Sequence, residues 1–320
     1  MNIAFGTDSN LLKQACVMLT SLQLNNKNES INIYAFLLDI TEDDKKLLSS
    51  SIIAPNSLTV YEIHYYDLDS LALSSKYLSA GIYLRLFIEE KIDLSVKKIL
   101  YLDSDIVVCQ DISTFYNTDL SGFSIAACYD LEVSDIRRYN KLNYDMLENY
   151  FNSGVMLVNL EYWRKNYICR KTFEYLKKNN EVCFLPDQDA LNHVLHGTVK
   201  YVSSRYNVLC DFFNANLDNF LISNAMKARI LPEIQNPAII HYAGFYKPWY
   251  IEYHKYNFPF GKLWKKYLKL SKISYNMKHI RFIDKWTLKN IIKLFLLKVG
   301  LKKNCYPTFV STERIEKKLL

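Results

Sequence analysis

The chain has 320 residues, half of them hydrophobic, which allows a sizeable core and excludes a collagen-like, coiled-coil or largely disordered protein. Seven cysteines are scattered without a Cys-x-x-Cys pair, which argues against a disulfide framework or a structural zinc site. The net charge of +7 is uneven, because residues 262–303 carry 13 basic residues and one acid, while residues 1–261 carry a net −6.

The first hundred residues alternate between short apolar runs and helical segments. We expect strands at Ile3–Phe5, Ile31–Leu38 and Leu58–His64, with helices at about Leu11–Leu24 and Glu42–Ser51 between them. A parallel sheet with helical crossovers requires this order of elements. The pattern therefore predicts an α/β fold.

The remaining elements follow in the same manner up to about residue 250. The expected elements are a helix at 77–92, strands at Lys98–Leu102, Ile125–Cys128 and Val155–Asn159, a helix at Asp187–His196 and a last apolar run at Ala238–Ile240. Beyond that point the strand signals stop, and Lys, Tyr, Trp and Leu recur at helical spacing. We therefore expect a catalytic domain at 1–255 and a basic, aromatic extension at 256–320.

Two carboxylates stand at the C-terminal end of one predicted buried strand. Asp103 and Asp105 follow Lys98–Leu102, and ligands of open α/β sheets bind beyond the carboxyl ends of strands. Such an acid pair suits Mn²⁺ or Mg²⁺ bridging phosphate oxygens, although most Asp-x-Asp pairs lie in solvated turns. No Gly-x-Gly-x-x-Gly or Walker loop occurs, so a phosphorylated ligand would need a metal.

Three further polar clusters adjoin apolar runs. Asn152-Ser153-Gly154 precedes a predicted strand, Asp187-Gln188-Asp189 opens a helix, and His241 ends the last apolar run, with Lys247 shortly after it. His241 could complete a metal site and Lys247 could meet a phosphate. Simpler interpretations are a turn, helix N-terminal charges and a core histidine. Asp130 could touch a sugar hydroxyl or be a plain loop acid.

Taken in order, these blocks resemble glycosyltransferase family 8, the retaining enzymes that build bacterial lipopolysaccharide, with glycogenin as a distant relative. The resemblance runs from Asn2 to about Trp249. Its blocks are Gly6–Asn10, Tyr83–Leu86, Leu102–Asp105, Phe151–Gly154, Pro186–Asp189 and the segment His241–Trp249. It implies the GT-A fold, which is Rossmann-like and binds nucleotide-diphospho-sugars, with a helical basic C-terminal extension.

The resemblance also implies roles for matching residues. Asp103, Asp105 and His241 would hold Mn²⁺, with Mg²⁺ as the other possibility, and the metal would bridge the phosphates of a UDP-sugar. The implied donor-binding residues are Gly6, Thr7, Asp8 and Asn10 at the base and ribose, Ser104 between the acids, Gly244 and Lys247 at the diphosphate, and Arg85, Asn152, Asp187 and Gln188 around the sugar. Of these, Gln188, Asp187 and Arg85 are expected at the reacting centre.

The chemistry favours front-face attack. A divalent cation stabilises a leaving diphosphate, and the sugar becomes oxocarbenium-like as in glycoside hydrolysis. The resemblance implies that no carboxylate nucleophile is well placed and that Gln188 lies closest to the far face of the anomeric carbon, and a neutral amide is a poor nucleophile. The leaving phosphate would then take the acceptor proton, while Gln188 stabilises positive charge.

The expected function is retaining transfer of glucose or galactose from UDP-glucose or UDP-galactose to a lipid-linked oligosaccharide, the lipopolysaccharide core. One alternative is a nucleotide-sugar-binding protein of the same fold without turnover. Another is a protein- or self-glycosylating enzyme like glycogenin. Assays with each class of acceptor would separate these hypotheses.

The basic extension and the N-terminus indicate where in the cell the protein is expected. Trp286–Val299 forms an amphipathic pattern with basic rims, typical of a helix in a membrane interface, although a helix packed on the body would look similar. Met1–Gly6 does not resemble a signal peptide, and no window reaches the roughly 18 apolar residues of a spanning helix. We therefore expect a cytoplasmic protein, peripheral at the inner leaflet of the cytoplasmic membrane, that binds no nucleic acid.

Overall fold

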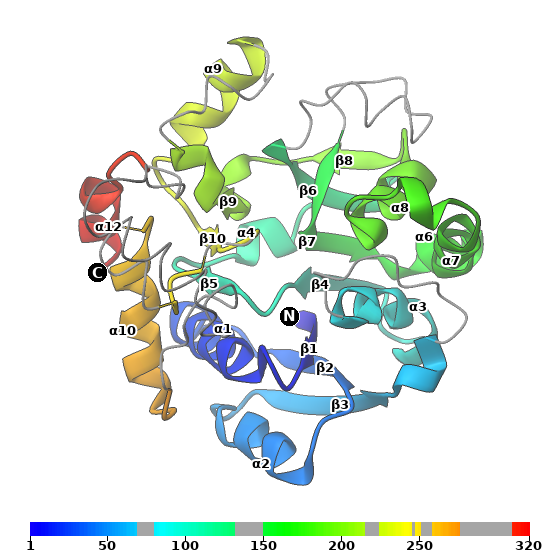
Figure 1. The fold of residues 1–320 in the computed structure, drawn as a ribbon, viewed down its shortest axis with the longest axis horizontal. Coiled ribbons are helices and arrows are strands. Elements are labelled where there is room, and N and C mark those ends of the chain that lie inside the picture. Colours follow the sequence, from blue (N-terminus) through cyan, green and yellow to red (C-terminus); the bar gives the residue numbers. More distant parts are fainter. Residues whose placement is uncertain (69–79, 132–149, 215–223, 245–246, 251–257, 276–308) are drawn as a thin grey trace, which may run out of the picture.

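The computed structural model describes residues 1–68, 80–131, 150–214, 224–244, 247–250, 258–275 and 309–320 (Figure 1). A seven-stranded sheet runs in the order β3–β2–β1–β4–β7–β6–β8, beside a three-stranded sheet β5–β10–β9. The strands are β1 (Asn2–Asp8), β2 (Asn32–Leu38), β3 (Ser57–Ile63), β4 (Lys98–Leu102), β5 (Ile106–Val108), β6 (Ile125–Tyr129), β7 (Phe151–Asn159), β8 (Val199–Tyr201), β9 (Val208–Leu209) and β10 (Ile239–His241).

Helices cover the sheets. The α-helices are α1 (Leu12–Asn25), α2 (Glu42–Ser50), α3 (Ile88–Lys91), α4 (Ser113–Tyr116), α6 (Leu160–Asn166), α7 (Ile168–Asn179), α8 (Pro186–Leu195), α9 (Asn224–Glu233), α10 (Gly261–Ser271) and α12 (Glu313–Leu319). The 3-10 helices include η2 (Ala80–Phe87) and η6 (Cys210–Phe213).

The parallel half of the sheet agrees with the sequence prediction. Strands β3, β2, β1 and β4 are mutually parallel, so their carboxyl ends share one edge. One difference concerns the helix expected at 77–92, where the described part is the 3-10 helix η2 followed by the single turn α3. Six of the eight η2 side chains are buried, so this segment lacks the solvent-facing stripe of a surface α-helix.

Strand β7 runs antiparallel to both of its neighbours, β4 and β6. It begins at Phe151, so Asn152-Ser153-Gly154 belongs to the strand and is not a turn. Its N-terminal end lies beside the C-terminal end of β4, where Leu102 pairs with Val155 and the Asp103 amide donates to the Gly154 carbonyl at 2.8 Å. The polar start of β7 therefore adjoins the acid pair.

The small sheet brings the end of β10 to the same place. Strand β10 pairs antiparallel with β5, with His241 opposite Ile106, and parallel with β9. The Tyr242 amide then donates to the Asp105 carbonyl at 3.0 Å. Asp105 and His241, more than 130 positions apart in the chain, are thus brought together by backbone pairing.

The described part of the C-terminal extension packs on the body. Helix α10 packs beside α1 (Figure 1), and its Leu263, Trp264 and Tyr267 are buried in a core that includes Tyr242 and Trp249. Helix α12 contacts the N-terminal end of α10 through a hydrogen bond. This part of the extension shares a core with the body. The division at 255 stays a prediction.

The membrane prediction for the amphipathic Trp286–Val299 segment lies outside the described residues. In the part of the chain that the structure describes, no helix is both long enough and apolar enough to cross a membrane.

Candidate active site

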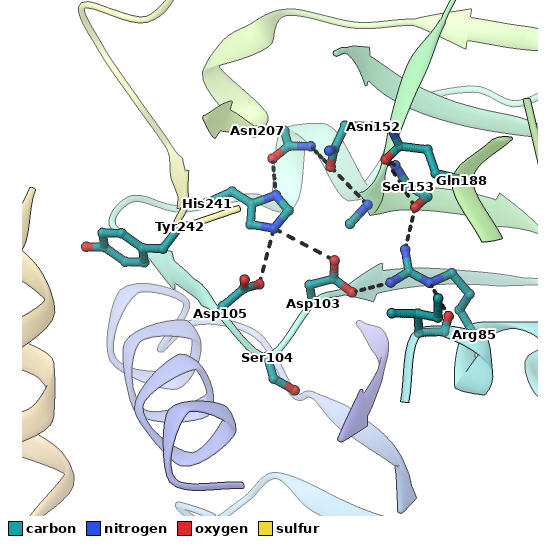
Figure 2. Close-up of polar contacts among 12 residues, drawn as sticks. Arg85, Asp103, Ser104, Asp105, Asn152, Ser153, Gln188, Asn207, His241 and Tyr242 are labelled. Carbon is teal, nitrogen blue, oxygen red and sulfur yellow. Dashed lines mark hydrogen bonds and ion pairs between the residues drawn. The ribbon is translucent and has the colours of Figure 1, made fainter. Parts of the chain in front are cut away.

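The acid pair and His241 converge at the edge of the sheet (Figure 2). Asp103 and Asp105 lie in the loop from β4 to β5, and His241 ends β10. The His241 Nε2 atom is 3.2 Å from Asp105 Oδ1 and 3.7 Å from Asp103 Oδ2. One ligand atom from each of the three residues lies within 4.8 Å of the others. Two carboxylates and an imidazole form a donor set suited to a divalent metal such as Mn²⁺.

The backbone of Gly154 leaves room for this cluster. A Cβ atom at this position would overlap Cε1 of His241 and lie 2.5 Å from Asp103 Oδ2. Any side chain here would press on two of the three candidate ligands, and backbone in a sheet cannot easily move away. The glycine therefore lets His241 and Asp103, two of the candidate ligands, pack directly against the backbone of β7.

Arg85 is buried and joins two acids. Its Nη2 donates to Asp103 Oδ1 at 2.7 Å, its Nε lies 3.2 Å from Asp187 Oδ2, and its Nη1 donates to Ser153 Oγ at 2.6 Å. Burial alone would lower the pKa of Arg85, but the neighbouring carboxylates raise the pKa above its usual range. Arg85 therefore keeps its charge, and Asp187, at the start of α8, is already paired.

The electrostatics of Asp187 and Asp105 differ. Burial raises the pKa of Asp187 despite the nearby Arg85. Burial would also raise the pKa of Asp105, but the Lys247 ammonium and His241 outweigh it and hold the pKa well below the usual range. Lys247 donates to both Asp105 Oδ2 and the Tyr242 carbonyl. Asp105 is therefore the carboxylate that remains charged most firmly.

Gln188, the second residue after the Pro186 that opens α8, is held at both ends of its amide. Its Oε1 accepts from the Ser153 amide at 2.9 Å, and its Nε2 donates to Asp130 Oδ2 at 3.0 Å. The same Asp130 oxygen accepts from Asn152 Nδ2 at 2.7 Å. The sequence left two roles open for Asp130, a contact with a sugar hydroxyl or a plain loop acid. The structure shows that it is a buried member of this network.

The residues at the end of β1 contact the cluster indirectly. Asp8 Oδ1 accepts from the backbone amides of Asn10 and Leu11, which turns the chain into α1. The Ser104 hydroxyl donates to the Gly6 carbonyl at 2.8 Å, which ties the end of β1 to the acid pair. Thr7 is buried and Asn10 is exposed.

Gly244 lies three residues after His241. Its φ of +79° favours glycine, and a Cβ there would lie 3.7 Å from Asp211 Oδ2. Asp211 itself follows β9, in the short helix η6. Of the two residues expected at the diphosphate, Lys247 contacts the cluster directly, through Asp105.

One buried residue in the site was not found from the sequence. Asn207 bonds to Nδ1 of His241 at 2.9 Å and donates to Asn152 Oδ1 at 2.8 Å. It stands just before the two-residue strand β9, in a segment without a motif. Only the pairing of β9 with β10 brings it beside His241.

Comparisons with known proteins identify the family of the chain. The family model described as "Glycosyl transferase family 8" matches residues 2–252. A lipopolysaccharide 1,2-glucosyltransferase of Escherichia coli (strain K12) is 29% identical, over 78% of this chain and 73% of that protein. A lipopolysaccharide 1,3-galactosyltransferase of Salmonella typhimurium is 26% identical, over the same shares of the two chains. The general stress protein A of Bacillus subtilis is 29% identical, over 78% of this chain and 87% of that protein.

Solved structures share the fold. The galactosyltransferase LgtC, in complex with donor and acceptor sugar analogs, superposes with a TM-score of 0.75 at 24% identity, covering 86% of this chain and 98% of LgtC. The glycosyltransferase GlyE of Streptococcus pneumoniae TIGR4 superposes with a TM-score of 0.61 at 20% identity, covering 95% of this chain and 64% of GlyE.

Proposed function

The chain belongs to glycosyl transferase family 8 and is a glycosyltransferase with the GT-A fold; from this premise we propose that it transfers glucose or galactose from a UDP-sugar to a lipid-linked glycan, with retention and with Mn²⁺. The observation that carries the proposal is the Asp103, Asp105 and His241 cluster beside the Arg85–Asp187 ion pair. A diphosphate needs cations and a sugar needs hydrogen-bonding partners, and this edge of the sheet offers both.

Asp103, Asp105 and His241 would hold the metal. When bound, it would supply positive charge against the diphosphate as that group leaves. Lys247 lies against Asp105 and would add a second cation at the diphosphate beside Gly244. On the other side, Gly6, Thr7, Asp8 and Asn10 would receive the uracil and ribose, near Ser104.

The donor sugar would lie among Arg85, Asn152, Asp187 and Gln188. The Gln188 oxygen already accepts from the Ser153 amide, and Asp187 is paired with Arg85. Neither side chain is therefore a ready nucleophile, which supports front-face attack with the leaving phosphate as proton acceptor. Gln188 would instead stabilise developing positive charge at the anomeric carbon electrostatically.

The acceptor class rests on relatives whose names include lipopolysaccharide glucosyl- and galactosyltransferases. We accordingly propose a lipid-linked oligosaccharide, reached at the inner leaflet of the cytoplasmic membrane. A basic face of α10 supports this, because Lys265 and Lys269 are exposed while the apolar face is buried. Polybasic surfaces bind anionic lipid through such residues.

Release of UDP tests the proposal. Purified protein is incubated with UDP-glucose or UDP-galactose, with Mn²⁺, Mg²⁺ or EDTA, and with lipooligosaccharide as acceptor. We expect Mn²⁺-dependent turnover with one donor, an α-configured product by NMR, and loss of turnover in Asp105→Asn. Asp111→Asn, in an exposed loop, is the matched control and should behave as wild type. Near-normal turnover of Asp105→Asn at limiting Mn²⁺ would contradict the metal assignment.

Two other outcomes would redirect the proposal. Donor binding without UDP release would identify a binding protein of this fold. A gain of hexose mass on the protein itself, or on an added protein acceptor, would identify a protein- or self-glycosylating enzyme. Intact mass spectrometry after incubation with each donor distinguishes these outcomes from transfer to lipid.

A further inference from the structure

A chain of hydrogen bonds lies behind the candidate metal ligands. The Asn207 side chain is fully buried between His241 and Asn152 (Figure 2). One end of its amide faces His241 Nδ1 at 2.9 Å, and the other faces Asn152 Oδ1 at 2.8 Å. Because an amide has one donor end and one acceptor end, its orientation decides which His241 nitrogen carries a proton.

The neighbouring Asn152 can take only one orientation. Its Oδ1 accepts from the backbone N–H of Gly154 at 3.0 Å, and its Nδ2 donates to Asp130 Oδ2 at 2.7 Å. A backbone N–H can only donate, and a carboxylate accepts, so reversing the Asn152 amide would break both bonds. The backbone of β7 therefore orients Asn152.

The orientation of Asn207 follows. Since Asn152 presents its oxygen, Asn207 must present Nδ2 to it and so turns its own Oδ1 toward His241. An amide oxygen accepts only, so His241 Nδ1 must carry a proton. The other ring nitrogen, Nε2, is then the atom left to bind a cation, and it faces Asp103 and Asp105.

We propose that Asn207 is a positioning residue that selects the Nε2-ligating form of His241 and fixes its ring in the metal site. Histidine ligands generally donate their second N–H to a partner that sets their tautomer, and loss of that partner commonly weakens metal binding roughly 10- to 100-fold. The inference rests on the metal dependence proposed above, and deepens it by naming the residue that prepares the ligand.

The same network reaches the donor-sugar side of the site. Asp130 accepts from both Asn152 and Gln188, and the Gln188 oxygen accepts from the Ser153 amide. Two successive amides of β7, those of Ser153 and Gly154, thus orient two side-chain amides that meet on one carboxylate. Asn207 links His241 to this arrangement.

The test measures Mn²⁺ binding by electron paramagnetic resonance, with electron spin-echo envelope modulation to detect the ¹⁴N coupling of a bound imidazole. Asn207→Leu keeps the size of the side chain and removes both hydrogen bonds. Asn207→Asp keeps the acceptor toward Nδ1 and removes the donor toward Asn152. Asn26→Leu is the matched control, because Asn26 is likewise a buried amide bonded at both ends. Its partners lie away from the site: it accepts from the Ile112 amide and donates to the Leu22 carbonyl.

We expect Asn207→Leu to weaken Mn²⁺ binding roughly 10- to 100-fold and to reduce the imidazole coupling. Asn207→Asp should retain wild-type coupling and near wild-type affinity, and Asn26→Leu should lose stability without losing affinity. If Asn207→Leu does not fold, Asn207→Asp decides: wild-type coupling supports the proposal, and a tenfold weaker Kd overturns it.

The outcomes separate this inference from the function on which it rests. Wild-type protein that binds no Mn²⁺ would overturn the metal assignment and, with it, the role of Asn207. Wild-type binding with imidazole coupling, unchanged in a folded Asn207→Leu variant, would overturn the role of Asn207 alone. Equal loss of affinity in Asn207→Leu and Asn26→Leu would show a general effect of destabilisation and would also overturn it.

Discussion

Gly154 illustrates how a missing side chain makes room in the site. The position is part of a buried strand, where a glycine normally costs stability because it adds no packing and gains backbone entropy on unfolding. Here a Cβ would overlap His241 and press on Asp103. The cost of glycine is therefore offset by the space that the candidate metal ligands require.

Gly154→Ala should weaken Mn²⁺ binding and lower the free energy of unfolding by roughly 1–3 kcal/mol, as overpacking of a close-packed site does. Isothermal titration with Mn²⁺ and urea unfolding measure the two effects. Gly261→Ala is the control, because a Cβ there meets nothing within 4 Å. Wild-type affinity in Gly154→Ala would mean that the ligands are not held against this backbone.

Asp211 gives a pH-dependent prediction. Burial, followed by the charge of Asp130, raises the pKa of Asp211 to about 6. The folded state then binds this proton more tightly than the unfolded state, so the penalty for ionised Asp211 is full above pH 6 and disappears as the pH falls toward 4.

Asp211→Asn should therefore raise the free energy of unfolding at pH 7.5, by roughly 1–3 kcal/mol, and should give no gain near pH 4. Urea unfolding at both pH values measures this. Asp119→Asn is the control, since hydrogen bonds to Ser121 lower the pKa of that exposed acid. An equal gain at both pH values would show that Asp211 titrates normally in the folded protein.

Substituting Gln188 tests its proposed role in stabilising charge. Gln188→Ala should lower kcat strongly, without abolishing transfer, because a neutral amide assists the reaction and forms no covalent bond with the sugar. Steady-state kinetics with the preferred donor measure kcat and KM separately. Isolation of a glycosyl adduct on wild-type Gln188 would contradict the front-face mechanism.

Among the elements, strand β7 contributes most to the arrangement of the site, and helix α10 joins the C-terminal region to the core. Strand β7 enters the sheet against the direction of β4, so its polar N-terminal end meets the acid pair instead of lying at the far edge. Helix α10 turns its apolar face inward against α1 and leaves its lysines outward. At the N-terminal end of α10, the Glu316 carboxylate accepts from the Leu263 amide at 2.8 Å, so α12 caps α10.

The core role of α10 can be measured through Trp264. This side chain is 2% exposed and packs against Trp249 and Tyr275, with ring centroids 5.4 and 5.5 Å apart respectively. Trp264→Ala should cost about 3–5 kcal/mol of unfolding free energy. Leu270→Ala, exposed on the same helix, should cost much less. Equal, small losses in both variants would show that α10 is separable from the body.

At the scale of the whole molecule, charge is separated between an acidic body and a basic C-terminal region. Because α10 belongs to the core, deletion of the extension would change stability together with membrane affinity. Substitution of exposed lysines keeps the fold and changes only the surface charge. Each basic residue near an anionic surface contributes about 1 kcal/mol, and salt screens it.

The variant Lys265→Gln, Lys269→Gln should therefore co-sediment less with vesicles containing anionic lipid and should retain wild-type UDP release from soluble donor. High salt should remove the difference between variant and wild type. A control with Lys45→Gln and Lys46→Gln, on α2 in the acidic body, should sediment as wild type. Equal sedimentation of all three proteins would show that the face of α10 does not bind membranes.

Local sequence was enough to predict the alternating elements of the parallel half and the residue types of the site. Asp103 and Asp105 could be placed after a buried strand because apolar periodicity and the chemistry of carboxylates are local properties. The order of the blocks from Gly6 to His241 was likewise enough to indicate the family, which the match over residues 2–252 shows.

The direction of β7, the packing of α10 and the place of Asn207 became known only from the three-dimensional fold. A buried strand has the same apolar composition whether it pairs parallel or antiparallel, so local sequence could not show that Asn152–Gly154 adjoin Asp103. Asn207 meets His241 because β9 and β10 pair across more than 30 residues of chain. Hydrogen bonds between distant strands set these neighbours, and no local pattern records them.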